Sequence, residues 1–193
     1  FKQRQGDLER ERLARLRHTP SVTLDGQKIE LLANIEMPED TEAAMTAGAL
    51  GVGLFRSEFL FMGRQGDLPD EEAQYQAYRR AVDGMNGLPV TIRTVDVGAD
   101  KPLDEIRHEA SHLNPALGLR AIRWCLADPA MFLTQLRAIL RAAQAVTQRG
   151  ISCLPEIMIP LAMTAAELRR MRDLADGIAA QVFAEGQPVP YLF

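Results

Sequence analysis

Short apolar runs alternate with longer amphipathic stretches along this chain. The apolar runs lie at residues 29–35, 51–55, 90–95, 151–160 and 189–193. Runs of this length indicate buried strands, and the stretches between them carry apolar residues at helical spacing. Strands that alternate with helices are typical of a parallel sheet with crossover helices. Because the runs are continuously apolar rather than alternating, we expect both faces of the sheet to be covered.

Capping signals mark where the helices begin. Pro38 can open the first crossover helix, and acidic residues within 67–70 can cap the second. Asp128, followed by proline, caps the third, and Thr164 with Glu167 matches a capping box for the fourth. The apolar residues expected to face the core are Ala43, Ala44 and Ala47 in the first helix, Tyr75, Tyr78, Val82 and Met85 in the second, and Phe132, Leu133, Leu136, Leu140 and Ala143 in the third.

The two ends of the chain have distinct patterns. Residues 1–20 are helical in composition, and Pro20 ends that pattern because the residue before proline is steered out of the helical region. Asp25 and Gly26 then predict a turn. The chain starts without methionine inside the helical pattern and stops where a fifth strand begins. We therefore expect both ends to continue in a longer protein.

Two architectures fit this order of elements: an open doubly wound sheet and a (β/α)8 barrel. No glycine-rich dinucleotide fingerprint follows the first strand, which favours the barrel. A complete barrel runs to about 250 residues. The four strand–helix units in these 193 residues would then form the first half of a (β/α)8 TIM barrel, an α/β fold.

Composition excludes some classes of function. The chain is 47% hydrophobic and 25% charged, as in ordinary globular proteins, and its formal net charge is −4. That balance does not favour binding to nucleic acid or to an anionic membrane. No apolar stretch approaches the ~20 residues of a membrane helix, and no secretory signal opens the chain, so we expect a cytoplasmic protein.

The cysteines and histidines do not form a recognisable metal or redox motif. Cys125 and Cys153 lack such spacing, and we interpret them as core thiols. His108 and His112 are four residues apart and could share one helical face as metal ligands. They lie in a polar connection with no third ligand apparent, which disfavours a zinc site.

Charged side chains follow two neighbouring strands. Arg56 comes directly after the second strand, and Arg93 ends the third, with Lys101 beyond it. Ligands bind at the carboxyl ends of strands in both architectures, so these cations predict a compact anion site. Glu58 would orient Arg56, and Asp96 would orient Arg93, by ion pairing. Structural ion pairs at the rim of the sheet, without a ligand, remain an alternative.

Four motifs resemble those of a known family. They are "GVGLFRSEFLFM", "TIRTVDVGADKPL", "NPALGLRAIR" and "QLRAILRAA". Together and in this order they resemble Enzyme I of the bacterial phosphotransferase system, the phosphoenolpyruvate–protein phosphotransferase. The resemblance implies a homodimeric (β/α)8 barrel that binds phosphoenolpyruvate and Mg2+. It also implies a swivelling N-terminal domain, whose histidine passes the phosphoryl group to a histidine-containing phosphocarrier protein that drives sugar uptake.

The resemblance also implies roles for individual residues. It assigns phosphoenolpyruvate binding to Arg56 and Arg93, and less directly to Lys101 and Arg120. The supporting residues are Ser57, where the family usually has threonine, Glu58 and Asp96. We expect no catalytic residue and no metal ligand in this chain, since the phospho-accepting histidine, the proton-donor cysteine and the Mg2+ ligands of the family lie elsewhere.

The same resemblance divides the chain. Residues 1–20 would be the end of a linker helix from the N-terminal phosphohistidine domain, and residues 21–193 the first half of the barrel. Two alternatives stay open. One is a related enzyme such as pyruvate phosphate dikinase, phosphoenolpyruvate synthase or a nitrogen-type paralogue. The other is a half-barrel that serves as a binding module without turnover.

Overall fold

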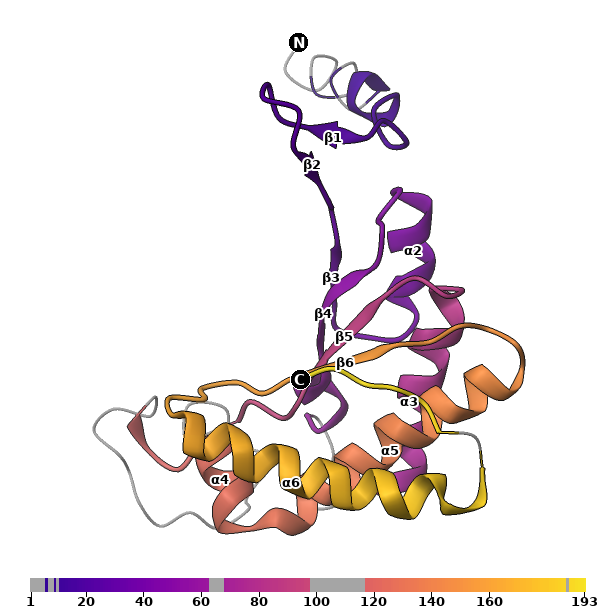
Figure 1. Cartoon of the computed structure of the whole chain (residues 1–193). Helices are drawn as coiled ribbons and strands as arrows, with labels where there is room; N and C mark the ends of the chain where they lie inside the picture. The colour runs from indigo at the N-terminus through magenta and orange to yellow at the C-terminus, as the bar shows by residue number, and fades with distance from the viewer. Residues whose placement is uncertain (1–5, 7–8, 10, 63–67, 98–116, 187) are drawn as a thin grey trace.

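A four-stranded parallel sheet organises the protein. The computed structural model describes the chain except for residues 1–5, 7–8, 10, 63–67, 98–116 and 187. The strands are β3 (Ala33–Ile35), β4 (Val52–Arg56), β5 (Val90–Arg93) and β6 (Pro155–Met158). Their spatial order, β3-β4-β5-β6, is their order in the chain (Figure 1). Every neighbouring pair is parallel, so the predicted parallel sheet is confirmed.

The helices pack against one side of this sheet (Figure 1). They are α2 (Asp40–Thr46), α3 (Glu71–Gly84), α4 (Ile122–Ala127), α5 (Pro129–Gln148) and α6 (Ala165–Val182), followed by a short 3-10 helix, η3 (Phe183–Glu185). Helix α5 contacts both α3 and α6 and supplies the centre of the core. Its predicted apolar stripe is confirmed at Phe132, Leu136, Leu140 and Ala143, which are fully buried, whereas Leu133 is only partly buried.

The two faces of the sheet differ in burial. Along β5, Val90 and Ile92 are buried, whereas Thr91 and Arg93 are only partly buried. Strand β6 repeats this alternation, so one face packs on the helices and the other is partly exposed within the described part of the chain. The expectation that both faces are covered is therefore wrong for these residues. Apolar residues on the second face, such as Met158, made the strands look continuously buried.

The helix starts follow the capping signals. Asp70 accepts a hydrogen bond from the Ala73 N–H (2.8 Å), and Asp128 accepts one from Ala130 (3.3 Å). Thr164 and Glu167 form the predicted capping box at the start of α6. These polar side chains satisfy backbone donors that have no partner within the helix. The sequence signals for α3, α5 and α6 are thus confirmed.

The N-terminal region differs from the prediction. Residues 28–35 do not form one strand, because β2 (Lys28–Ile29) turns back and pairs in antiparallel fashion with β1 (Ser21–Val22). Gly26 makes the predicted turn at a φ of +89°, which suits glycine. Only β3 joins the main sheet. The apolar run therefore contributes strands to two different sheets. Residues 11–14, which precede it, are helical, as expected.

Smaller differences concern the first and last helical connections. In α2 only Thr41 and Ala44 are buried, whereas Ala43 and Ala47 are exposed, so the predicted alanine packing is wrong at those two positions. Helix α4 was not predicted. Near the C-terminus, Leu192 forms a parallel bridge with Glu156, in agreement with a strand beginning there.

The sheet is not closed into a barrel in the described part of the chain, where β3 lies at one edge and the Leu192 bridge at the other. Among the described residues, no helix combines the length and the apolar character that crossing a membrane requires.

Candidate anion-binding site

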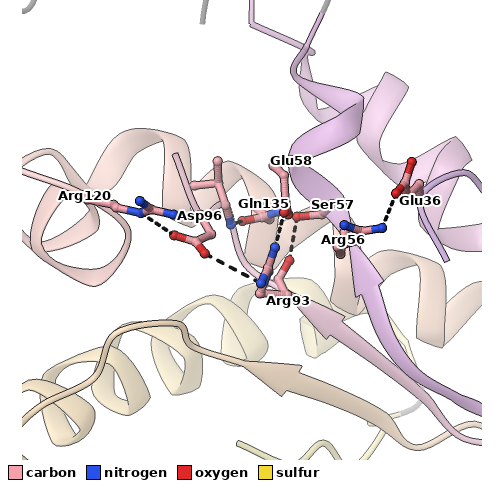
Figure 2. Close-up of polar contacts among 9 residues, drawn as sticks. Glu36, Arg56, Ser57, Glu58, Arg93, Asp96, Arg120 and Gln135 are labelled. Atoms are coloured by element: carbon pink, nitrogen blue, oxygen red, sulfur yellow. Dashed lines mark hydrogen bonds and ion pairs between the residues drawn. The ribbon is translucent and has the colours of Figure 1, made fainter. Parts of the chain in front are cut away.

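Arg56 and Arg93 lie side by side at the carboxyl ends of two parallel strands. They are paired residues in the register of β4 and β5, so the sheet itself brings the two guanidinium groups to one edge (Figure 2). Arg56 is the last residue of β4 and Arg93 the last of β5. Two neighbouring arginines can bind the oxygens of a phosphate or carboxylate with paired N–H groups.

A short 3-10 helix, η1 (Ser57–Leu60), follows Arg56 and directs the next two side chains inward. Ser57 and Glu58 have no exposed surface. The carboxylate of Glu58 accepts a hydrogen bond from Arg93 Nη2, so it is paired with the neighbouring strand and not with Arg56. The expectation that Glu58 orients Arg56 is wrong, because the 3-10 turn points Glu58 across the sheet.

The partner of Arg56 is Glu36, which the sequence did not predict. Glu36 directly follows β3, the neighbour of β4, and its carboxylate accepts from Arg56 Nη2 (Figure 2). The Arg56 guanidinium also lies over the ring of Phe59, 5.2 Å from its centroid. Asp40 accepts from the backbone N–H groups of Glu36 (3.0 Å) and Met37 (2.9 Å), which holds this segment at the strand end.

Asp96 joins a third arginine to the cluster. One of its oxygens is 3.6 Å from Arg93 Nη1, and the other accepts from Arg120 Nε at 2.9 Å. Arg120 precedes α4 and is distant from β5 in sequence, yet Asp96 links it to Arg93, with Arg56 on the far side of Arg93 (Figure 2). The predicted pairing of Asp96 with Arg93 is present. Lys101, His108 and His112 lie outside the described residues.

The Arg56–Glu36 pair is more exposed than the Arg93–Glu58 pair. The side chain of Arg56 is 34% exposed and that of its partner Glu36 is 41% exposed. By contrast, Arg93 is 16% exposed and Glu58 is fully buried. Within the described part of the structure, the buried Nε atoms of Arg56 and Arg93 have no hydrogen-bond partner. The Arg56–Glu36 pair is therefore accessible to an incoming ligand, whereas the Arg93–Glu58 pair lies deeper in the site.

A buried glutamine on α5 underlies the same strand ends. Gln135 contacts Ser57, Tyr78 and the backbone of Val95 by hydrogen bonds, and it was not among the predicted residues. Burial raises the pKa of Tyr78 well above its ordinary value, so its hydroxyl stays protonated. The sequence signal for Gln135 is a polar residue at a position of α5 where the helical pattern predicts an apolar, buried one.

Neither metal binding nor thiol chemistry is supported by the described residues. No group of three or more His, Cys, Asp or Glu is arranged to hold a metal within the described ranges. Glu58 and Asp96 are instead paired with arginines. Both cysteines are free, Cys125 buried and Cys153 partly buried, and burial raises their thiol pKa values to about 12 and about 11.

Comparison with known proteins places this arrangement in a family. The family described as PEP-utilising enzyme, PEP-binding domain, matches residues 10–191. The phosphoenolpyruvate-protein phosphotransferase of Cupriavidus necator is 68% identical over 146 residues, which are 74% of this chain and 25% of that protein. Proteins of the same name from Geobacillus stearothermophilus and Listeria innocua are 45% and 40% identical, over 82% and 94% of this chain.

The chain corresponds to only part of each relative, spanning 25% of the Cupriavidus protein, 26% of the Geobacillus protein and 30% of the Listeria protein. The family match, in contrast, extends over nearly all of this chain and includes Arg56 and Arg93 at the strand ends and Arg120 before α4. The chain therefore belongs to the PEP-binding domain family of PEP-utilising enzymes.

Proposed function

We propose that this chain is the phosphoenolpyruvate-binding part of a phosphoenolpyruvate–protein phosphotransferase, and that Arg56 and Arg93 hold the phosphate of the substrate. The observation that carries the proposal is their pairing in register at the carboxyl ends of β4 and β5. Arg120 extends the cationic surface beyond Asp96. Lys101 is proposed as a further ligand on the family resemblance alone.

The chemistry of phosphoryl transfer suits such a site. The transferring group needs alignment and positive charge against its equatorial oxygens more than covalent help from the protein. A guanidinium keeps its charge at any physiological pH and presents a planar fork of N–H donors. Ser57, Glu58 and Asp96 support the arginines, Ser57 through the Arg93 carbonyl and the carboxylates by ion pairing.

The proposed fold of the longer protein is a (β/α)8 barrel. Support comes from the strand order, which rises without a reversal, and from the helices on one face of the sheet. Parallel sheets are almost always covered on both faces. The partly exposed face with Thr91, Arg93 and Met158 would then be the barrel interior, covered by four further strands. In this division, residues 1–20 end a linker helix and residues 21–193 form the first half of the barrel.

The remaining properties concern the whole protein. We propose that it transfers the phosphoryl group to a histidine of its own N-terminal domain and then to a histidine-containing phosphocarrier protein for sugar uptake. Homodimerisation through the barrel and a cytoplasmic location belong to the same proposal. Support comes from the relatives, which are named phosphoenolpyruvate-protein phosphotransferase.

Mg2+ is proposed as the cofactor of the whole protein, with ligands outside this chain. The acidic side chains at this site do not fit a metal by themselves. Glu36, Glu58 and Asp96 each face a guanidinium, and the described part of the chain offers no cluster of three metal-ligating side chains. In the proposal, Glu58 and Asp96 orient Arg93, and Glu36 is the carboxylate that the ligand displaces from Arg56.

Titration with phosphoenolpyruvate tests the proposal. Isotope-labelled chain is titrated with phosphoenolpyruvate, pyruvate and inorganic phosphate while the Arg56 and Arg93 side-chain NMR signals are followed. We expect phosphoenolpyruvate to bind most tightly and the Arg93→Ala variant to lose the response. Arg80→Ala is the control, because Arg80 is 66% exposed and pairs with Glu39, away from the site. Equal responses to all three anions would contradict the assignment of the substrate.

A further inference from the structure

The side chain of Gln135 is completely buried and bonded at both ends of its amide. Its Oε1 accepts from the backbone N–H of Val95 at 2.9 Å. Its Nε2 donates to Ser57 Oγ at 2.9 Å and to Tyr78 OH at 2.7 Å. Both N–H groups and the carbonyl oxygen are thus used, so only one orientation of the amide satisfies all three partners.

These contacts connect the two segments that carry the arginines. Ser57 directly follows Arg56, and Val95 lies two residues beyond Arg93. Ser57 Oγ also donates to the carbonyl oxygen of Arg93 at 2.5 Å. Gln135, on α5, therefore closes a ring of hydrogen bonds between the end of β4 and the end of β5 (Figure 2).

The ring acts where the regular ladder of the sheet ends. The pairing of β4 with β5 ends at Arg56 and Arg93. Strand pairing therefore no longer fixes the segments that follow these two residues relative to each other. Breaking a buried hydrogen bond leaves an unsatisfied polar group, which is costly in a low-dielectric interior. The ring is therefore able to hold the two strand ends at one spacing.

We propose that Gln135 is a positioning residue: it fixes the spacing between the Arg56 and Arg93 segments, so that both arginines meet one bound anion. The part that concerns the anion rests on the proposed function. The part that concerns the spacing stands on the hydrogen bonds alone. Gln135 itself does not contact the exposed ends of either guanidinium.

The chain contains a matched control for the experiment. Gln74 on α3 is also a buried glutamine, 1% exposed, and bonds Pro69 O at 2.9 Å and Tyr78 OH at 3.4 Å. It shares the neighbour Tyr78 but contacts neither strand end. The variants Gln135→Leu and Gln74→Leu each remove one buried amide, so both should lower stability, and only the first should alter the arginine segments.

Three measurements on the whole chain separate a positioning role of Gln135 from a purely stabilising one. The first is chemical denaturation, and the second is NMR, which gives the hydrogen-exchange rate of the Val95 amide and the signal of Arg93 Nε. The third is titration with phosphoenolpyruvate. We expect Gln135→Leu to speed Val95 exchange, to shift or broaden the Arg93 signal and to weaken binding about tenfold or more. Gln74→Leu should leave Val95, Arg93 and the affinity within about twofold of the starting chain.

An unchanged Val95 exchange rate and Arg93 signal in Gln135→Leu would overturn the proposal, as would equal losses in the Gln74→Leu control. If the unmodified chain binds no phosphoenolpyruvate, the proposed function fails, whereas the exchange and NMR data still decide the positioning role. If Gln135→Leu does not fold, Ser57→Ala replaces it. That variant removes the single atom that joins Gln135 to the Arg93 carbonyl, and the same shift of the Arg93 signal is expected.

Discussion

Glu58, in the 3-10 helix η1 that follows β4, is fully buried and forms an ion pair with Arg93, the last residue of β5. Removing one partner of a buried pair leaves an uncompensated charge, which typically costs about 3–5 kcal/mol. We expect Glu58→Ala to cost less than this range, because Arg93 keeps Asp96 as a second partner and is 16% exposed. The free energy of unfolding from denaturant titration measures the loss.

Glu58→Gln is the control for that substitution, since the amide keeps the size and an acceptor oxygen. A smaller loss of stability is expected for Glu58→Gln than for Glu58→Ala. Equal stability of Glu58→Ala and the unmodified chain would show that the pair with Glu58 does not hold Arg93.

Glu36 is paired with the guanidinium of Arg56, which an anionic ligand would need to contact. The pair with Arg56 is partly exposed, and surface pairs contribute about 0–1 kcal/mol, so we expect an anion to displace Glu36 at modest cost. We expect Glu36→Gln to strengthen phosphoenolpyruvate binding by about 1.5- to 5-fold and to change stability by less than about 1 kcal/mol. Glu39→Gln, at an exposed carboxylate paired with Arg80, should change neither. Weaker binding in Glu36→Gln would instead make Glu36 an orienting partner.

Arg93 should matter for turnover as well as for binding. In a full-length phosphotransferase that carries this domain, Arg93→Ala is expected to lower phosphorylation of the enzyme histidine by about 10²–10³-fold, because the proposed function puts this cation against the transferring group. Single-turnover transfer from labelled phosphoenolpyruvate measures this rate. Arg80→Ala provides the surface control. A near-normal rate in Arg93→Ala would leave that arginine a structural ion pair.

The chain by itself should not become phosphorylated. The family resemblance implies that the phospho-accepting histidine and the Mg2+ ligands lie elsewhere, so labelled phosphoenolpyruvate and Mg2+ should transfer no stable label to this chain. Acid-labile label is measured after gel filtration, with the longer protein as a positive control. Stable label on His108 or His112 would contradict this expectation.

The thiols should react only when the protein unfolds. Burial favours the neutral form and raises the pKa of Cys125 to about 12 and of Cys153 to about 11, from an ordinary 9.0. Since the thiolate is the nucleophile, labelling by a thiol reagent at about pH 8 should be slow in the folded chain and fast in denaturant. The raised pKa values add stability that is present below pH 9 and is lost as the pH rises through about 11 to 12. Rapid labelling of folded protein would contradict the burial.

Local signals predicted most of the fold. The caps at Asp70, Asp128 and Thr164 depend on residues close in sequence, and the helices start where those signals lie. The antiparallel pairing of β1 with β2 depends instead on tertiary contacts, that is, on which strand lies next to the apolar run in the folded protein. Residues 28–35 carry no local feature that divides them between two sheets.

The site was predictable only at its strand ends. Arg56 and Arg93 followed from the rule that ligands bind at the carboxyl ends of strands. Their partners did not follow, because Glu36 lies 20 residues before Arg56 and Gln135 lies on a helix 78 residues beyond Ser57. A sheet joins such residues through its register, which single-sequence patterns do not contain. The sequence indicated Glu58 as a supporting residue but predicted Arg56 as its partner, whereas its partner is Arg93.

The pairing of Arg56, Arg93 and Arg120 with acidic side chains has a consequence for how a ligand reaches the site. Paired charges produce a field that decays within a short distance, and the whole chain carries a formal net charge of −4. An anion in solution is therefore not steered toward these arginines from afar. Under the proposed function we therefore expect recognition at contact range, through the geometry of N–H donors, and an association rate that depends little on ionic strength.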